Sequence, residues 1–266
     1  MTHGPYTSLV FVESTAYFTI DRAASGNAMT WAMYDALVEA CDEVDGDPEG
    51  VRVFVIRANG GVFCTGTDIT QFTTFASGED GLEYERRLER CLTRLEHVAV
   101  PTIAQVDGIA AGAGCAIALA CDLRVCTPAA KFGVPIARTL GNGLSMENCA
   151  RLVEHFGIAR TKDLLFTGRL IDATEAAASG IVTKMAESSN IEAAVADLAA
   201  SIARNAPLTI SAMKDTLHAL SMQRRLTSNP EMKDIAELIA SCYASRDFRE
   251  GVAAFIAKRK PQFTGE

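Results

Sequence analysis

Apolar residues recur along this chain with two periods, which separate strands from helices. Short runs rich in apolar and β-branched residues predict strands at residues 8–13, 17–20, 51–56, 101–106 and 123–126. Apolar positions at the helical period predict helices at about 30–44, 83–98, 145–156, 162–167 and 172–179. Polar residues and two glycines predict a mobile loop at 71–81. Strand–strand–helix units recur along this part, which indicates a wound repeat.

The last part of the chain shows only the helical period. Four helices are expected there, at about 190–204, 207–220, 231–244 and 247–258. We therefore expect a mixed α/β body at residues 1–190 and a helical region at residues 191–266.

Two glycine-rich turns follow predicted strands. One is Gly108–Gly114, which opens a helix of small residues, and the other lies around Gly66. Glycine lets a ligand approach the backbone, and the first N–H groups of a helix are free to donate to it. Two converging N–H groups would form an oxyanion hole, which stabilises the anionic oxygen of a reacting thioester. The alternative is that the two turns only pack against each other.

Composition excludes several classes of function. The 266 residues carry a formal net charge of −8, so general binding to nucleic acid or anionic membranes is not expected. No apolar run approaches the ~20 residues of a membrane span, and the N-terminus lacks a signal-peptide pattern, so we expect a cytoplasmic protein. The eight cysteines form no Cys-x-x-Cys and the four histidines show no ligand spacing. Buried reduced thiols and no metal site are therefore expected.

The glycine turn does not complete the fingerprint of a dinucleotide-binding site. Gly112 and Gly114 follow a strand, but Ile117 replaces the third glycine and residues 131–138 contain no acid. No Gly-x-Ser-x-Gly motif is present, and Ser145 is better explained as a helix N-cap than as a nucleophile.

Eight segments, in order along nearly the whole chain, resemble the crotonase superfamily, the enoyl-CoA hydratase/isomerase family. They are residues 21–28, 63–69, 106–114, 121–123, 131–135, 166–170, 176–182 and 250–260. The resemblance implies an α/β fold, a spiral of ββα units with a helical C-terminal trimerisation region. It also implies an acyl-CoA thioester substrate, a homotrimer or dimer of trimers, and no cofactor apart from the coenzyme A of the substrate.

The resemblance also assigns site residues by position. The oxyanion-hole donors would be the N–H groups of Thr67 and Ala113. The coenzyme A contacts would be Arg22, Ala24, Cys64, Thr65, Gly66, Asp68, Ile69, Gly112, Phe255 and Lys258. Ala24 stands where the family often has lysine, which weakens one expected phosphate contact. The basic run 258–260 suits the phosphates of coenzyme A, or alternatively complements a helix C-terminus.

The chain departs from the family at the catalytic carboxylates. Ala116 and Ile136 stand at the two glutamate positions of the hydratases, and Asn142 or Gly143 stands at the aspartate position of another subgroup. Alanine and isoleucine cannot transfer protons. The polar residues that could reach the pocket instead are Arg138, Thr139 and Asn142, after Ile136, and Glu147, with Asn142 and Glu147 as the main candidates. Glu147 also fits a helix-dipole partner.

Four other residues near these segments could also reach the pocket, but each has a structural explanation as well. Asp68 fits a brace for its turn, and Tyr84 and Glu85 border the predicted loop. Cys115 fits the core better than it fits a nucleophile.

We therefore expect an enzyme that stabilises a thioester enolate. Isomerase, lyase or decarboxylase chemistry suits the missing glutamates better than standard hydration does. The alternatives are a non-catalytic acyl-CoA-binding or scaffold protein, and a hydratase that uses a displaced Glu147. The aromatic residues Phe72 and Phe75, together with Ile136, suggest an apolar acyl pocket.

Overall fold

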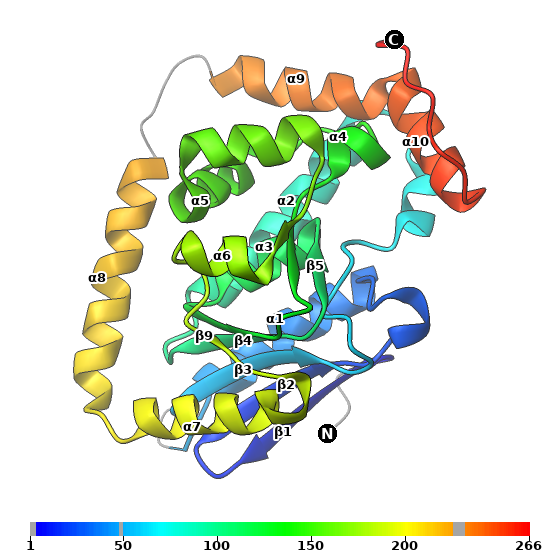
Figure 1. Ribbon diagram of the computed structural model, residues 1–266. Coiled ribbons are helices and arrows are strands. Elements are labelled where there is room, and N and C mark those ends of the chain that lie inside the picture. The colour runs from blue at the N-terminus through cyan, green and yellow to red at the C-terminus, as the bar shows by residue number, and fades with distance from the viewer. Residues whose placement is uncertain (1–3, 48–49, 226–231) are drawn as a thin grey trace.

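A six-stranded sheet carries the body of the protein (Figure 1). The structure is a computed structural model, and it describes residues 4–47, 50–225 and 232–266. The strand order is β1 (Thr7–Val12), β2 (Thr15–Ile20), β3 (Val53–Ala58), β4 (Thr102–Val106), β6 (Leu123–Cys126) and β9 (Lys184–Met185). Only the β1–β2 hairpin is antiparallel, and the other neighbours pair in parallel. A second sheet holds β5 (Ile109–Ala111), β7 (Lys131–Gly133) and β8 (Ile171–Asp172).

Helices connect the strands and form the C-terminal region. In the body they are α1 (Trp31–Asp45), α2 (Gly78–Glu96), α3 (Ala113–Ala120), α4 (Ile136–Thr139), α5 (Met146–Thr167) and α6 (Ala173–Ala178). Short 3-10 helices lie at η1 (Ala23–Ser25), η2 (Ile69–Thr74) and η3 (Ser188–Asn190). The C-terminal region holds α7 (Ile191–Ala203), α8 (Pro207–Arg225), α9 (Met232–Ala244) and α10 (Arg246–Ile256).

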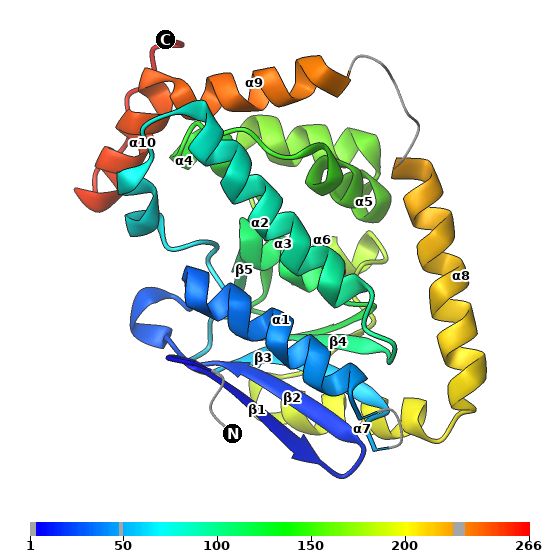
Figure 2. The same cartoon turned by 180° about the vertical axis from the view of Figure 1, so that it is seen from behind.

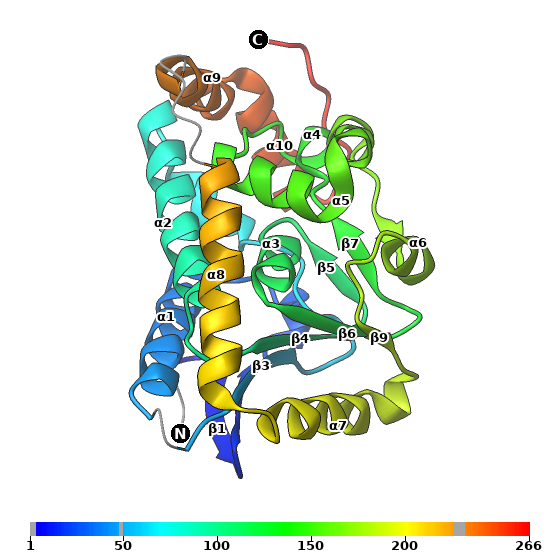
Figure 3. The same ribbon diagram turned by 90° about the vertical axis from the view of Figure 1, so that its left-hand side faces the viewer.

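The two faces of the large sheet pack against different layers. On β3, Phe54 and Ile56 point into the larger core with α1 to α3, whereas Val53 and Val55 point toward α7. This alternation is the strand period of two, with both faces buried. Figures 2 and 3 show α1 and α2 on one side of the sheet and α7 on the other. Helix α8 then runs along the edge of the body toward α9 and α10 (Figure 3).

The predicted α/β fold class is confirmed, and the strands agree within a few residues. The mobile loop predicted at 71–81 is wrong, because η2 occupies its first half and α2 begins at Gly78. Asp80 explains this early start, since its carboxylate accepts from the N–H groups of Ala76 and Ser77, each at 2.8 Å. The predicted break at Gly157 is confirmed, because its φ of 74° interrupts α5. Residue 231, the expected start of α9, lies outside the described residues.

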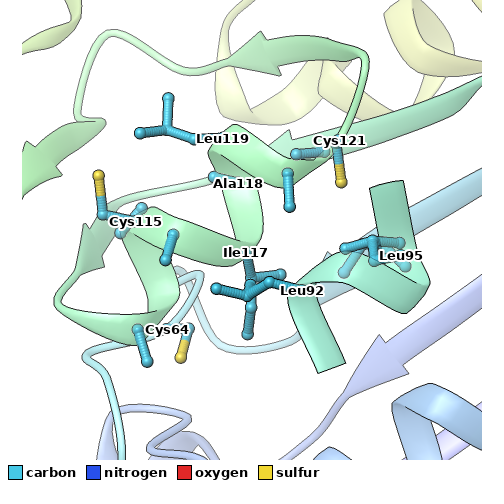
Figure 4. Close-up of a cluster of buried hydrophobic side chains, with 14 of the residues drawn as sticks. Cys64, Leu92, Leu95, Cys115, Ile117, Ala118, Leu119 and Cys121 are labelled. Atoms are coloured by element: carbon cyan, nitrogen blue, oxygen red, sulfur yellow. The ribbon is translucent and has the colours of Figure 1, made fainter. Parts of the chain in front are cut away.

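Helix α3 is buried along its whole length, which its small residues allow. A Cβ added to Gly114 would overlap the carbonyl of Cys64, so this helix start tolerates no side chain. Figure 4 shows Ile117 of α3 lying against Leu92 of α2, with Cys64 and Cys121 at the edges of the same cluster. This packing holds the glycine turn in place at the N-terminus of α3.

All eight cysteines are free thiols. Six are buried, and burial raises the pKa of the Cys115 thiol to about 12, so Cys115 belongs to the core, as expected. Within the described ranges, His, Cys, Asp and Glu form no cluster of three that could hold a metal ion. Nor does any helix there have the length and apolar character to cross a membrane.

Candidate active site

The two glycine-rich turns meet at one point of the structure. Gly66 has a φ of 114° and Gly112 a φ of 55°, conformations that side chains other than hydrogen rarely allow. A Cβ built on Gly66 would lie 3.6 Å from the amide nitrogen of Ala113. The strands fix this approach, because the N–H of Cys64 donates to Ile109 and the N–H of Ala111 donates to Cys64, both at 2.9 Å.

This approach brings the amides of Thr67 and Ala113 to the same cavity. Ala113 is the first residue of α3, where no carbonyl of the preceding turn is available to its N–H. Neither amide donates to another residue in the described part of the chain. The Thr67 hydroxyl is held between the hydroxyls of Tyr34, at 2.7 Å, and Tyr84, at 2.9 Å. Thr67 is therefore fixed, while its backbone donor stays available.

The cavity beside these amides has a volume of about 230 Å³ and mostly apolar walls. Ala116 and Ile136 both line it, so the two predicted gaps in the set of catalytic carboxylates lie where a substrate would bind. Its apolar and glycine lining residues also include Gly66, Ile69, Phe72, Leu88, Gly112, Leu119, Val134, Pro135, Leu140, Leu144, Leu152 and Phe255. Phe75 is absent from this wall and packs instead against Tyr243 and Phe248.

Glu85 is the only acidic residue among the described residues that line the cavity. Its side chain comes from α2 and is 4% exposed. One carboxylate oxygen accepts from the Tyr243 hydroxyl at 2.6 Å, and the other accepts from the Ser145 N–H at 2.8 Å. Burial raises the pKa of this carboxyl to about 7, against the lowering effect of the two hydrogen bonds. Glu85 can therefore exchange a proton near neutral pH.

A buried cation also lines the cavity, but its donors are already used. Arg151 is 1% exposed and bonds to Glu89, Glu96 and the side-chain oxygen of Asn148. The contacts of Nε, Nη1 and Nη2 engage all five guanidinium hydrogens. Arg151 consequently holds α2 against α5 and has no donor left for a substrate.

Of the two polar residues predicted to act in catalysis, only one lines the cavity. Asn142 lines the cavity, and its amide donates to the Tyr243 hydroxyl at 3.0 Å. Glu147 does not line this cavity, and the prediction that it acts there is wrong. It lies in the first turn of α5 and lines a second hollow between α2 and α9, beside Arg90 and Ile239, and Glu85 lies in the walls of both. Hydration through a displaced Glu147 has no geometric basis.

The predicted coenzyme A contacts divide into four groups. Thr65, Gly66, Ile69, Gly112 and Phe255 line the cavity. Cys64 is fully buried beneath it. Arg22 and Asp68 form an ion pair at 2.7 Å that braces their turns.

The remaining predicted contacts lie at the surface. Ala24 and Lys258 are exposed. The basic run at 258–260 is weaker than its sequence suggests, because Glu250 pairs with Arg259 at 2.7 Å and neutralises that charge. The two lysines of the run are left for phosphate groups.

The sequence placed Glu85 only among several polar residues near the pocket, without choosing it as the acid, and gave no indication of Tyr243. The signal for Glu85 was present, because it interrupts the apolar face formed by Tyr84, Leu88 and Leu92 of α2. Tyr243 comes from α9, far along the chain. Its ring packs directly against Gly81 of α2, where an added Cβ would overlap it. No local pattern connects these two residues.

Comparisons with known proteins agree with the fold. A family model for enoyl-CoA hydratase/isomerase matches residues 11–266. A probable enoyl-CoA hydratase from Bacillus subtilis (strain 168) is 32% identical, over 97% of this chain and 98% of its own. The probable mitochondrial enoyl-CoA hydratase 2 of Arabidopsis thaliana is 34% identical, over 92% of this chain and 80% of its own. A solved structure of methylmalonyl-CoA decarboxylase in complex with 2-nitronate-propionyl-CoA has a TM-score of 0.90 at 27% identity, over 98% of this chain and 99% of that one.

The family model, the sequence relatives and the solved structure together define the class of protein. The chain belongs to the enoyl-CoA hydratase/isomerase family of the crotonase superfamily. The prediction of a crotonase-family enzyme for acyl-CoA thioesters is confirmed at that level.

Proposed function

We propose that the protein decarboxylates a 2-carboxyacyl-CoA thioester and stabilises the resulting enolate between the amides of Thr67 and Ala113. The observation that carries the proposal is this pair of free amides beside a cavity with apolar walls at Ala116 and Ile136. The likeness to methylmalonyl-CoA decarboxylase, at a TM-score of 0.90, supports it.

The chemistry follows from what the cavity offers. The bond between the α-carbon and the carboxylate breaks, CO2 leaves, and the electron pair passes to the thioester oxygen. Two N–H donors aimed at this oxygen stabilise the enolate as its charge develops. Apolar walls hold the departing carboxylate away from water, whereas neutral CO2 needs no such solvation. A proton then adds to the α-carbon.

Other family chemistries suit this cavity less well. Hydration needs one group to activate water and another to protonate carbon, and the described lining holds a single acidic residue, Glu85. Double-bond isomerisation begins with an ionised base, and the raised pKa of Glu85, about 7, leaves only part of this carboxyl ionised at neutral pH. Decarboxylation forms the enolate without any base.

A panel of thioesters tests the proposal. The purified protein is incubated with malonyl-CoA, methylmalonyl-CoA and crotonyl-CoA, and products are followed by mass spectrometry. We expect the carboxylated thioesters to lose CO2 and crotonyl-CoA to persist. Hydration of crotonyl-CoA with both carboxylated thioesters unchanged would refute decarboxylation.

A second candidate, a non-catalytic acyl-CoA-binding protein, is favoured by the apolar residues Ala116 and Ile136 alone. The same panel separates the two. Calorimetric binding of every thioester without turnover of any would establish the binding protein.

In either case we propose that Phe255 and Lys258 contact the coenzyme A moiety, together with the backbone of residues 64–69. No further cofactor and a cytoplasmic location also remain predictions.

We also propose a homotrimer or a dimer of trimers assembled through the C-terminal helices. Helix α8 exposes Met213, Leu217 and Leu220, at 61%, 67% and 50% of their surface. Apolar side chains this exposed at helical spacing mark an interaction face. Light scattering is expected to give a multiple of three chains, and the variant Met213→Glu with Leu217→Glu to lower it. A monomeric wild-type protein would contradict this assembly.

A further inference from the structure

We infer that Glu85 delivers the proton to the α-carbon of the enolate, and that Tyr243 and the Ser145 N–H position its carboxyl for this step. The inference rests on the enolate of the proposed function. It does not depend on how that enolate forms. It assigns the proton transfer to a residue outside the two positions where the resemblance to the family places carboxylates.

The first support is the place of Glu85 in the cavity wall. Glu85 shares that wall with Thr67, Ala113 and Ala116, and no other described lining residue is acidic. Helices α2 and α3 pack against each other. The carboxyl of Glu85 on α2 therefore lies at the same cavity as Ala116 on α3, which has no carboxyl group.

The second support is that the carboxyl is held from two other elements. The Tyr243 hydroxyl comes from α9 and donates to one oxygen at 2.6 Å, while it accepts from the Asn142 amide at 3.0 Å. The Ser145 N–H, at the start of α5, donates to the other oxygen at 2.8 Å. A carboxyl has about four acceptor positions, so these two bonds leave room for the acidic proton. Groups held this way on helices keep a defined direction.

The third support is the charge around the group. On α2 itself Tyr84 and Glu89 lie near, and Tyr243 faces the carboxyl from α9. From α5 come Ser145 and Cys149. Arg151 provides no free positive charge, because Glu89 and Glu96 already pair with it. Burial and the nearby charge of Glu89 favour the protonated acid and outweigh the hydrogen bonds from Tyr243 and Ser145, which favour the carboxylate. The resulting pKa of about 7 lets Glu85 take up a new proton from solvent near neutral pH.

The step balances without any further reactant. The O–H bond of Glu85 breaks and a C–H bond forms at the α-carbon. The enolate electron pair forms that bond, and the thioester carbonyl is restored. The carboxylate left on Glu85 then takes a proton from water. One proton is consumed for each CO2 released.

The test replaces Glu85 by glutamine, which keeps the shape and can still accept from Ser145 and bond to Tyr243. We expect Glu85→Gln to lower kcat for methylmalonyl-CoA about 10²-fold with little change in KM. Wild-type kcat is expected to fall above about pH 7, and this dependence should vanish in the variant. The matched control is Glu83→Gln, an exposed position of the same helix, expected to behave as wild type. An unchanged rate and pH profile in Glu85→Gln would overturn the inference.

A second readout separates this inference from the proposed function. Propionyl-CoA incubated with the wild-type protein in D2O is expected to exchange an α-hydrogen, because the carboxylate form of Glu85 can remove it. Exchange that persists at the wild-type rate in Glu85→Gln refutes the role of Glu85. Exchange lost in the variant, with no decarboxylation by the wild type, supports Glu85 and refutes only decarboxylation. Absence of exchange in the wild type as well counts against the role of Glu85 and leaves decarboxylation to be judged by the thioester panel.

A structural role for Glu85 is distinguished by Tyr243→Phe, which removes the positioning hydroxyl but leaves the acid. We expect it to lower kcat about tenfold and to keep a pH-dependent rate with a shifted midpoint. A purely structural carboxyl would instead lower the melting temperature of Glu85→Gln with the pH profile intact. Because the pKa of Glu85 is raised in the fold, its contribution to stability is lost as pH rises through about 7. At pH 8 the glutamine variant is therefore expected to melt no lower than wild type.

Discussion

Replacing Ala113 by proline is expected to lower kcat about 10²- to 10³-fold while the protein stays folded. Proline has no N–H, so the substitution deletes one of the two donors proposed to bind the enolate oxygen. Ala113 is the first residue of α3, the helix position where proline is best tolerated. Gly112, with φ 55° and ψ −126°, has the mirror image of the extended conformation that precedes proline.

The measurement is steady-state turnover of whichever carboxylated thioester the panel identifies, with circular dichroism to verify folding. Ala113→Gly serves as the control, because it keeps the N–H and adds no bulk to the cavity. We expect the glycine variant to retain activity within a few-fold of wild type. A folded proline variant with wild-type kcat would show that this amide does not hold the reacting oxygen.

Replacing Arg151 by alanine is expected to lower the free energy of unfolding by about 3–5 kcal/mol. The change removes the Arg151 guanidinium from the carboxylates of Glu89 and Glu96, and removes the donor to the side-chain oxygen of Asn148, which accepts from Arg151 at 2.6 Å. Glu96 is almost as buried as Arg151, with only 9% of its side chain exposed. Removing one partner of a buried pair leaves the other charge uncompensated, which costs more than the pair contributes.

Urea unfolding followed by circular dichroism measures this loss, with Arg90→Ala as the control on the same layer of helices. Arg90 pairs with Glu83 at 3.2 Å but is 67% exposed, so its removal is expected to cost at most about 1 kcal/mol. Arg151→Lys keeps the charge but not the five donors, and it should fall between the two. Equal stability of the Arg151→Ala and Arg90→Ala proteins would show that the buried network is not a major support of α2 on α5.

The glycine turns were predictable from the sequence because their chemistry is local. Gly66 and Gly112 adopt conformations that other residues avoid, so their presence in the sequence already indicated where the backbone is exposed to a ligand. The absence of carboxylates at Ala116 and Ile136 was equally readable. The two glycine turns predicted the position of the cavity, and Ala116 and Ile136 predicted that its walls are apolar.

Glu85 and Glu147 show where local reasoning failed. Glu147 lies two residues after the N-cap Ser145, and the sequence does not show which way this turn faces. The packing of α5 places Glu147 at a hollow beside α9. Glu85 lies within an apolar helix face, and its meaning depends on Tyr243, which is 158 residues away. Such pairs are set by tertiary packing, which no periodicity along one segment encodes.

The seat of Tyr243 on Gly81 also has a consequence for how the protein is made. The glycine turns, α2 and the cavity walls up to Leu152 leave the ribosome well before α9 does. The amide pair can form in the growing chain, but Glu85 meets its tyrosine only after α9 emerges. The chemistry proposed for this site therefore requires α9 to have been made and to have packed onto α2.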